Sequence, residues 1–218
     1  MRNDPDTPPA PVTSGVAFFD FDATLIHGDS LLMFIGELIG HRRAKLAFLD
    51  ALRSCPHRKL RGRLPGVDFP GSVKAILLRR TLNKIPLADA KAAAEQLRGK
   101  VRWHQPMLDR LLHHDRAGHR VVIATGALNI YMPALLRGLP VDDLLATPME
   151  VQDGRLTGQL SGSNCVRLAK AERVQSYLAE QGPFARSYGY GNRPSDIPML
   201  KVVDEPTIVR IPRGRPRD

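Results

Sequence analysis

The chain has 218 residues, two cysteines and a formal net charge of +10. This length is enough for one sizeable domain, or for a domain that carries a smaller insert. The cysteines, Cys55 and Cys165, lie far apart, which excludes a disulfide framework and a cysteine-based zinc site. The excess of basic residues favours anionic partners such as phosphorylated substrates, acidic lipid surfaces or nucleic acid.

Neither end of the chain carries a pattern typical of a membrane or secreted protein. Residues 1–15 are polar and rich in proline, without the apolar segment of a signal peptide, so we expect a flexible tail. The most hydrophobic stretch, Leu31–Ile39, is too short to span a bilayer and contains Glu37. We therefore expect a soluble cytoplasmic protein.

The first predicted strand, Val16–Phe19, runs directly into two acidic residues, Asp20 and Asp22. Because the two residues lie two positions apart, an extended chain would point both carboxylates to the same side. Such a pair suits a hard cation such as Mg²⁺, or a division of labour between a nucleophile and a proton shuttle. Taken alone, the same pattern is also typical of an ordinary strand that ends in solvent.

A long helical region follows, from residue 28 to residue 116. Asp29 or Ser30 can cap the first helix, whose apolar residues recur every three to four positions. The helices predicted in this region cover Leu31–Ile39, Ala44–Leu52, Ser72–Leu82, Leu87–Arg98 and Pro106–Arg116. Cys55-Pro56 interrupts them, and His57–Pro65 is predicted to be a basic loop.

The segment from Arg42 to Arg63 holds eight lysines or arginines and one acid, Asp50. The commonest explanation for this composition is a basic face exposed to solvent. The alternative is that the segment guides an anionic substrate to the site. Aromatic residues are nearly absent from the segment, which disfavours stacking on single-stranded nucleic acid.

From Arg120 onward, strands alternate with helices. The predicted strands are Val121–Ala124, a hairpin of Leu144–Glu150 with Arg155–Leu160, Ser187–Tyr190 and Thr207–Ile211. Helices are predicted over Ile130–Leu136 and from Asn164 to Leu178. Asp153-Gly154 is a hairpin-type turn signal.

This alternation predicts an α/β fold with a parallel sheet, whose ligand site lies at the carboxyl ends of the strands. Those ends carry Asp20, Asp22, Thr125, Asn192 and Asp196. The helical region is too long for a single crossover helix. We therefore expect it to form a cap folded over the site.

Four short motifs follow one another along the chain: Asp20-Phe-Asp22-Ala-Thr24, Thr125, Lys170 and Gly191-Asn-Arg-Pro-Ser-Asp196. In this order they resemble the motifs of the haloacid dehalogenase superfamily, and the chain is similar to its phosphoserine-phosphatase-like branch. The resemblance implies a Rossmann-like three-layer α/β/α core, with a small helical cap inserted after the first strand. On this basis the core comprises residues 16–27 and 117–212, the cap residues 28–116, and residues 213–218 a basic tail.

The resemblance also implies a role for each motif residue. Asp20 would be the nucleophile that forms an aspartyl-phosphate, and Asp22 the acid and base. Thr125, with its neighbour Gly126, and Lys170 would bind the phosphoryl group. The expected metal-site residues are Asp20, Asp22 through its carbonyl, Asn192 and Asp196, with Mg²⁺ as the cofactor.

Two residues depart from the family pattern. Ala23 stands where glycine is usual, a mild change unless the position needs a positive φ. Asn192 stands where the fourth motif usually has its first aspartate. An amide removes one negative charge, so we expect weaker binding of Mg²⁺.

These observations lead to two hypotheses about function. The first is an Mg²⁺-dependent phosphomonoester hydrolase acting on a small phosphorylated metabolite or a phospholipid precursor. Peripheral contact with an anionic membrane surface would accompany the lipid case. The alternative is a weakly active or inactive protein that binds lipid headgroups or nucleic acid through its basic surface.

Overall fold

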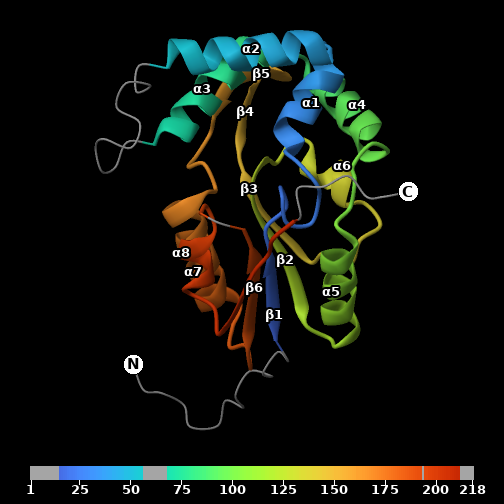
Figure 1. The fold of residues 1–218 in the computed structure, drawn as a ribbon, viewed down its shortest axis with the longest axis vertical. Helices are drawn as coiled ribbons and strands as arrows, with labels where there is room; N and C mark the ends of the chain where they lie inside the picture. The colour runs from blue at the N-terminus through green and yellow to red at the C-terminus, as the bar shows by residue number, and fades with distance from the viewer. Residues whose placement is uncertain (1–14, 56–67, 193, 212–218) are drawn as a thin grey trace.

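The computed structural model describes residues 15–55, 68–192 and 194–211. Five parallel strands form the central sheet, in the order β3-β2-β1-β6-β7 (Figure 1). They are β1 (Val16–Phe19), β2 (Arg120–Leu128), β3 (Asp143–Thr147), β6 (Ser187–Gly191) and β7 (Glu205–Ile208). The prediction of an α/β fold with a parallel sheet is confirmed.

Strand β1 lies in the middle of the sheet and is buried on both faces. Phe18 packs with residues of α7 (Arg167–Gln181) and α8 (Ile197–Leu200) on one face. Phe19 points to the opposite face, where it meets α5 (Gln105–Arg116). This double coverage explains why β1 is an uninterrupted apolar run in the sequence.

The prediction that α5 belongs to the cap is wrong. Figure 1 shows α5 beside the lower part of the sheet, away from the other helices of the region. Leu111 and His114 of α5 are buried, and the His114 ring lies 6.0 Å from that of Phe19. An apolar helix face that docks on a sheet has the same sequence pattern as one that docks on other helices.

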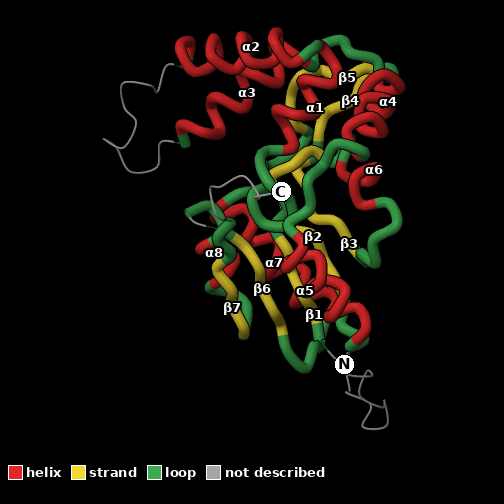
Figure 2. The backbone as a smooth tube through the Cα atoms, turned by 45° about the vertical axis from the view of Figure 1, so that its right-hand side comes forward, coloured by secondary structure: helices red, strands yellow, loops and turns green. Residues whose placement is uncertain are grey.

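The remaining helices of the region lie above the carboxyl end of the sheet (Figures 1 and 2). They are α1 (Ser30–Ile39), α2 (His41–Ser54), α3 (Phe69–Thr81) and α4 (Leu87–Arg98). Asp29 caps α1 by accepting a hydrogen bond from the Leu32 N–H at 3.1 Å, as expected. Helix α3 begins three residues before its predicted start because Asp68 caps it through the Gly71 N–H.

The predicted strand Leu144–Glu150 is two strands with different partners. Its first part is β3, which joins the parallel sheet beside β2. Its second part is β4 (Met149–Gln152), which pairs with β5 (Arg155–Leu160) in the expected hairpin. Pro148 separates the two because it has no N–H to continue a ladder. The hairpin extends upward to α3 (Figure 2).

Smaller differences occur near the carboxyl end. Helix α6 (Met132–Leu136) falls within its predicted range, whereas the last strand begins at Glu205 and ends at Ile208. Helix α7 begins at Arg167, not at Asn164. The predicted tails and the basic loop His57–Pro65 lie outside the described residues. No helix in the described part of the chain combines the length and apolar character needed to cross a membrane.

His114 is a buried histidine whose surroundings disfavour its charged form. It is 3 % exposed, and its ring nitrogens bond His119 Nδ1 at 2.7 Å and the Tyr190 hydroxyl at 2.8 Å. Burial, followed by the neighbouring His119, lowers the pKa of His114 from 6.5 to about 4. The unfolded chain therefore binds a proton between these pH values that the folded chain excludes.

We expect the free energy of unfolding to fall as pH drops below 6.5, by about 2 kcal/mol at pH 5. Urea titrations at pH 7 and pH 5 measure the difference, which His114→Gln should largely remove. The exposed His41 provides the control, since His41→Gln should retain the wild-type dependence. An unchanged pH dependence in His114→Gln would show that other groups cause it.

Candidate active site

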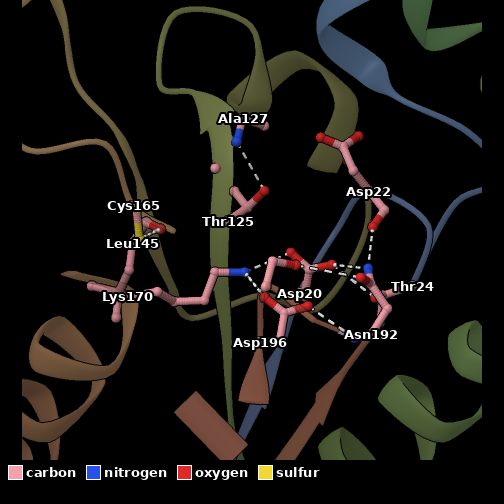
Figure 3. A network of polar contacts seen from close by, with 12 residues as sticks. Asp20, Asp22, Thr24, Thr125, Ala127, Leu145, Cys165, Lys170, Asn192 and Asp196 are labelled. Carbon is pink, nitrogen blue, oxygen red and sulfur yellow. Dashed lines mark hydrogen bonds and ion pairs between the residues drawn. The ribbon is translucent and has the colours of Figure 1, made fainter. Parts of the chain in front are cut away.

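The carboxyl ends of β1 and β6 bring together side chains from distant parts of the chain (Figure 3). The Lys170 ammonium on α7 donates to Asp20 Oδ1 at 2.7 Å and to Asp196 Oδ1 at 2.6 Å. All three residues are at most 5 % exposed. Three charges buried together, two negative and one positive, form the centre of the candidate site.

Lys170 keeps its positive charge in this environment. Burial alone would lower its pKa, but the carboxylates of Asp20 and Asp196 outweigh burial and raise the pKa above its ordinary value. The ammonium in turn offsets the repulsion between these two carboxylates. A buried lysine held this way is a fixed positive charge next to Asp20.

Asp22 presents its two ends to different surroundings. Its carboxylate Oδ1 accepts the Ser30 N–H at 2.7 Å, whereas its backbone carbonyl accepts from Asn192 Nδ2 at 2.9 Å. Burial, and then the negative charges of Asp29 and Asp20, raise the pKa of Asp22 to about 7. The carboxyl group therefore holds a proton for a sizeable fraction of the time near neutral pH.

Asn192 connects the acidic residues of the first and fourth motifs. Its amide Nδ2 donates to Asp20 Oδ2 at 3.2 Å as well as to the Asp22 carbonyl, and its backbone N–H donates to Asp196 Oδ2 at 2.8 Å. The preceding Gly191 allows this close approach, because a Cβ there would lie 2.6 Å from Asp196 Cβ. The amide thus lies where oxygens of Asp20 and Asp22 converge.

The oxygens at this point suit a hard divalent cation. The described residues contain no group of three histidine, cysteine, aspartate or glutamate side chains arranged for a metal. Two features account for the missing third side chain: the Asp22 carboxylate faces Ser30, and position 192 holds an amide in place of a carboxylate. The oxygens that remain are those of the Asp20 and Asp196 carboxylates and of the Asp22 carbonyl. The Asn192 amide presents Nδ2 to Asp20 and Asp22, so it would have to rotate to add its Oδ1 as a further ligand. With that rotation the oxygen donor set fits Mg²⁺.

Thr125 and Gly126 in β2 lie beside the buried charges. Thr125 is fully buried, and its hydroxyl accepts the Ala127 N–H at 3.0 Å, so its own proton is available to another acceptor (Figure 3). The Gly126 carbonyl accepts the Thr147 hydroxyl at 3.0 Å. The structure thus brings every residue of the predicted site to one edge of the sheet.

The sequence does not reveal the part played by two residues, Thr24 and Lys74. Thr24 belongs to the first motif, and its hydroxyl donates to Asp20 Oδ2 at 2.8 Å. Lys74 on α3 donates to the Gly126 carbonyl at 2.6 Å and to Asn164 Oδ1 at 2.7 Å. Burial lowers the pKa of Lys74 to about 8. No sequence signal separates Lys74 from the other basic residues of the helical region.

The Ala23 departure has a structural cost. Ala23 has a φ of 54°, in the left-handed region that glycine adopts without strain. The position therefore meets the condition under which replacing glycine is not mild, and the left-handed backbone of Ala23 costs about 1 kcal/mol. The turn nevertheless keeps Asp20, Asp22 and Thr24 in contact with Asn192.

The protein is thus of the α/β class, with paired aspartates at the end of its central strand and a buried lysine that bridges two acids. The sequence matches the haloacid dehalogenase-like hydrolase family over residues 17–201. The chain belongs to this family, as its motif order predicted.

The relatives of the chain include a protein named as a phosphatase. The chain is 32 % identical to protein CicA of Caulobacter vibrioides, covering 91 % of this chain and 86 % of that protein. It is 26 % identical to the histidinol-phosphatase of Neisseria meningitidis, covering 89 % of each chain. Together with the family match, these relatives support a phosphatase.

Two solved structures share the fold. A protein of unknown function from Bordetella pertussis Tohama I has a TM-score of 0.74 at 26 % identity, covering 89 % of each chain. A phospho-aspartyl intermediate analogue of phosphoserine phosphatase has a TM-score of 0.61 at 18 % identity, covering 89 % of this chain and 85 % of that one. This second likeness concerns the fold alone.

Proposed function

We propose that the protein is an Mg²⁺-dependent phosphomonoester hydrolase that acts through an aspartyl-phosphate on Asp20. The observation that carries the proposal is the set of contacts around this carboxylate. Lys170 binds one oxygen, while Thr24 and Asn192 bind the other. Such contacts fix the direction of the carboxylate at the end of β1.

The first step joins Asp20 to phosphorus. A carboxylate oxygen of Asp20 attacks, the bond between phosphorus and the ester oxygen breaks, and the leaving alkoxide takes the Asp22 proton. The raised pKa of Asp22 supplies that proton near neutral pH. In the second step Asp22 accepts a proton from water. The water oxygen attacks phosphorus, releasing inorganic phosphate and restoring the Asp20 carboxylate.

The remaining residues stabilise negative charge on the phosphoryl oxygens. The Lys170 ammonium, fixed beside Asp20, offsets repulsion between the nucleophile and the substrate. The Thr125 hydroxyl proton and the Gly126 N–H would bind a phosphoryl oxygen. Bound Mg²⁺, held by Asp20, Asp196, the Asp22 carbonyl and Asn192, would neutralise part of the same charge.

The proposal is tested by hydrolysis of p-nitrophenyl phosphate with Mg²⁺ and with a chelator. Turnover that needs Mg²⁺ is the expected result. Absence of turnover in both, with salt-dependent binding to anionic vesicles, would favour the alternative of a binding protein. Equal turnover in both conditions would contradict the proposed metal dependence.

We expect Asn192→Asp to bind Mg²⁺ at least about 10-fold more tightly than the wild type, because it adds a carboxylate to the ligand set. Without metal, three carboxylates would then lie together, so the variant should be less stable than the wild type in a chelator. Thermal unfolding across an Mg²⁺ titration measures both effects without relying on turnover. Equal shifts of melting temperature in the two proteins would remove Asn192 from the proposed metal site.

A further inference from the structure

A cavity of about 630 Å³ opens beside Asp22. It lies between the cap helices α1, α2 and α3 and the segments that carry Gly126 and Val166. Asp22, the proposed proton donor to the leaving alcohol, forms part of its wall. The cavity is therefore positioned to receive the alcohol part of a phosphomonoester, and its volume is typical of sites for ligands larger than an amino acid.

Three helices supply an apolar lining. The side chains concerned are Leu31 and Leu32 of α1, Phe48 and Leu52 of α2, and Val73 and Leu77 of α3. An apolar group placed against them would leave water, with a gain of about 25 cal/mol for each Å² buried. A charged or strongly polar group would lose its hydration there without a matching partner.

Within the described residues, the charged side chains that line the cavity already have protein partners. Asp29 caps α1, and Asp68 caps α3 while it also pairs with Arg167 at 3.5 Å. Lys74 donates to the Gly126 carbonyl and to Asn164. These charges hold the cap and the core in place. To bind an ammonium or a carboxylate of the substrate, these side chains would have to give up their contacts within the protein.

We propose that the substrate is the phosphate monoester of an apolar alcohol, either alkyl or aryl, whose hydrocarbon part fills this cavity. The inference rests on the proposed function, because it assigns the cavity to the leaving group of that reaction. It sets this chain apart from the relatives whose names specify amino-alcohol or amino-acid phosphates.

A series of n-alkyl phosphates from ethyl to octyl, with O-phosphoserine and histidinol phosphate beside it, tests the proposal. We expect kcat/KM to rise roughly two- to fourfold per methylene until the cavity is filled. Leu31→Gln should flatten this dependence. Leu46→Gln on the same cap should retain it, because Leu46 is 65 % exposed and does not line the cavity. A flat series in the wild type, or a preference for either amino compound, would overturn the proposal.

Binding of n-alkyl phosphonates separates this inference from the proposed function, because phosphonates are not hydrolysed. Calorimetry should give dissociation constants that fall with chain length in the wild type and stay level in Leu31→Gln. Chain-length-dependent binding without turnover of any ester would support the apolar cavity and contradict the hydrolase. If p-nitrophenyl phosphate is turned over but the dissociation constants of the phosphonates do not depend on chain length, the cavity assignment alone is contradicted.

Discussion

Asp20→Asn should reduce turnover of p-nitrophenyl phosphate by at least about 10⁴-fold, because an amide cannot act as the nucleophile. The substitution keeps the size of the side chain and one oxygen. It removes the negative charge that faces Lys170 at 2.7 Å. Steady-state rates of the wild type and the variant, at saturating Mg²⁺, measure the effect.

The control for this experiment is Asp115→Asn, which makes the same chemical change at an exposed position on α5. It should retain the wild-type rate. Circular dichroism should show that Asp20→Asn is folded, since Lys170 keeps Asp196 as its partner. A folded Asp20→Asn variant with more than a few per cent of wild-type turnover would exclude Asp20 as the nucleophile.

Lys170→Met should reduce both stability and turnover. Removing the ammonium leaves Asp20 and Asp196 buried together without their shared cation, which costs about 3–5 kcal/mol of unfolding free energy in a chelator. Turnover should fall by about 10²- to 10³-fold, because the phosphoryl group loses a fixed positive charge. Urea unfolding and steady-state kinetics measure the two losses.

The effect of Mg²⁺ on the stability of Lys170→Met distinguishes a catalytic metal site from an ion pair that only stabilises the fold. The cation should stabilise Lys170→Met more than the wild type, since it would supply the positive charge that the two carboxylates lack. Lys201→Met, on an exposed lysine that follows α8, should behave as the wild type does. Wild-type stability and turnover in Lys170→Met would contradict the role assigned to the buried ammonium.

The sequence was sufficient to predict the sheet and the convergence of the motif residues, for a physical reason. Strands covered on both faces, such as Val16–Phe19, need unbroken apolar runs, and such runs are visible without a structure. Parallel strands bring their carboxyl ends to one edge, so polar residues that follow them meet. Asp20 and Asn192 were placed together by this rule alone.

Other features depended on contacts between residues far apart in the sequence. Lys74 has no local pattern of its own, and only the docking of α3 brings its ammonium to Gly126. Helix α5 has an apolar face that fits a cap as well as a sheet. The break at Pro148 was visible in the sequence, but the separate partners of β3 and β4 were not.

The orientation of Asp22 was a further feature that sequence could not supply. The motif predicted two carboxylates on one side of an extended strand, but the chain leaves β1 at Phe19 and turns. Ala23, with its positive φ, lies in this turn. The carboxylate then faces Ser30, and the carbonyl faces Asn192. One residue can therefore serve as acid through its side chain and as a metal ligand through its backbone.

The most direct test of the central claim is the detection of phosphate bound covalently to the enzyme. Acid quenching of the wild type during turnover of ³²P-labelled p-nitrophenyl phosphate, followed by peptide mapping, should place the label on Asp20. Asp20→Asn should carry no label under the same conditions. Turnover without a labelled enzyme, or a label on another residue, would contradict the aspartyl-phosphate mechanism proposed here.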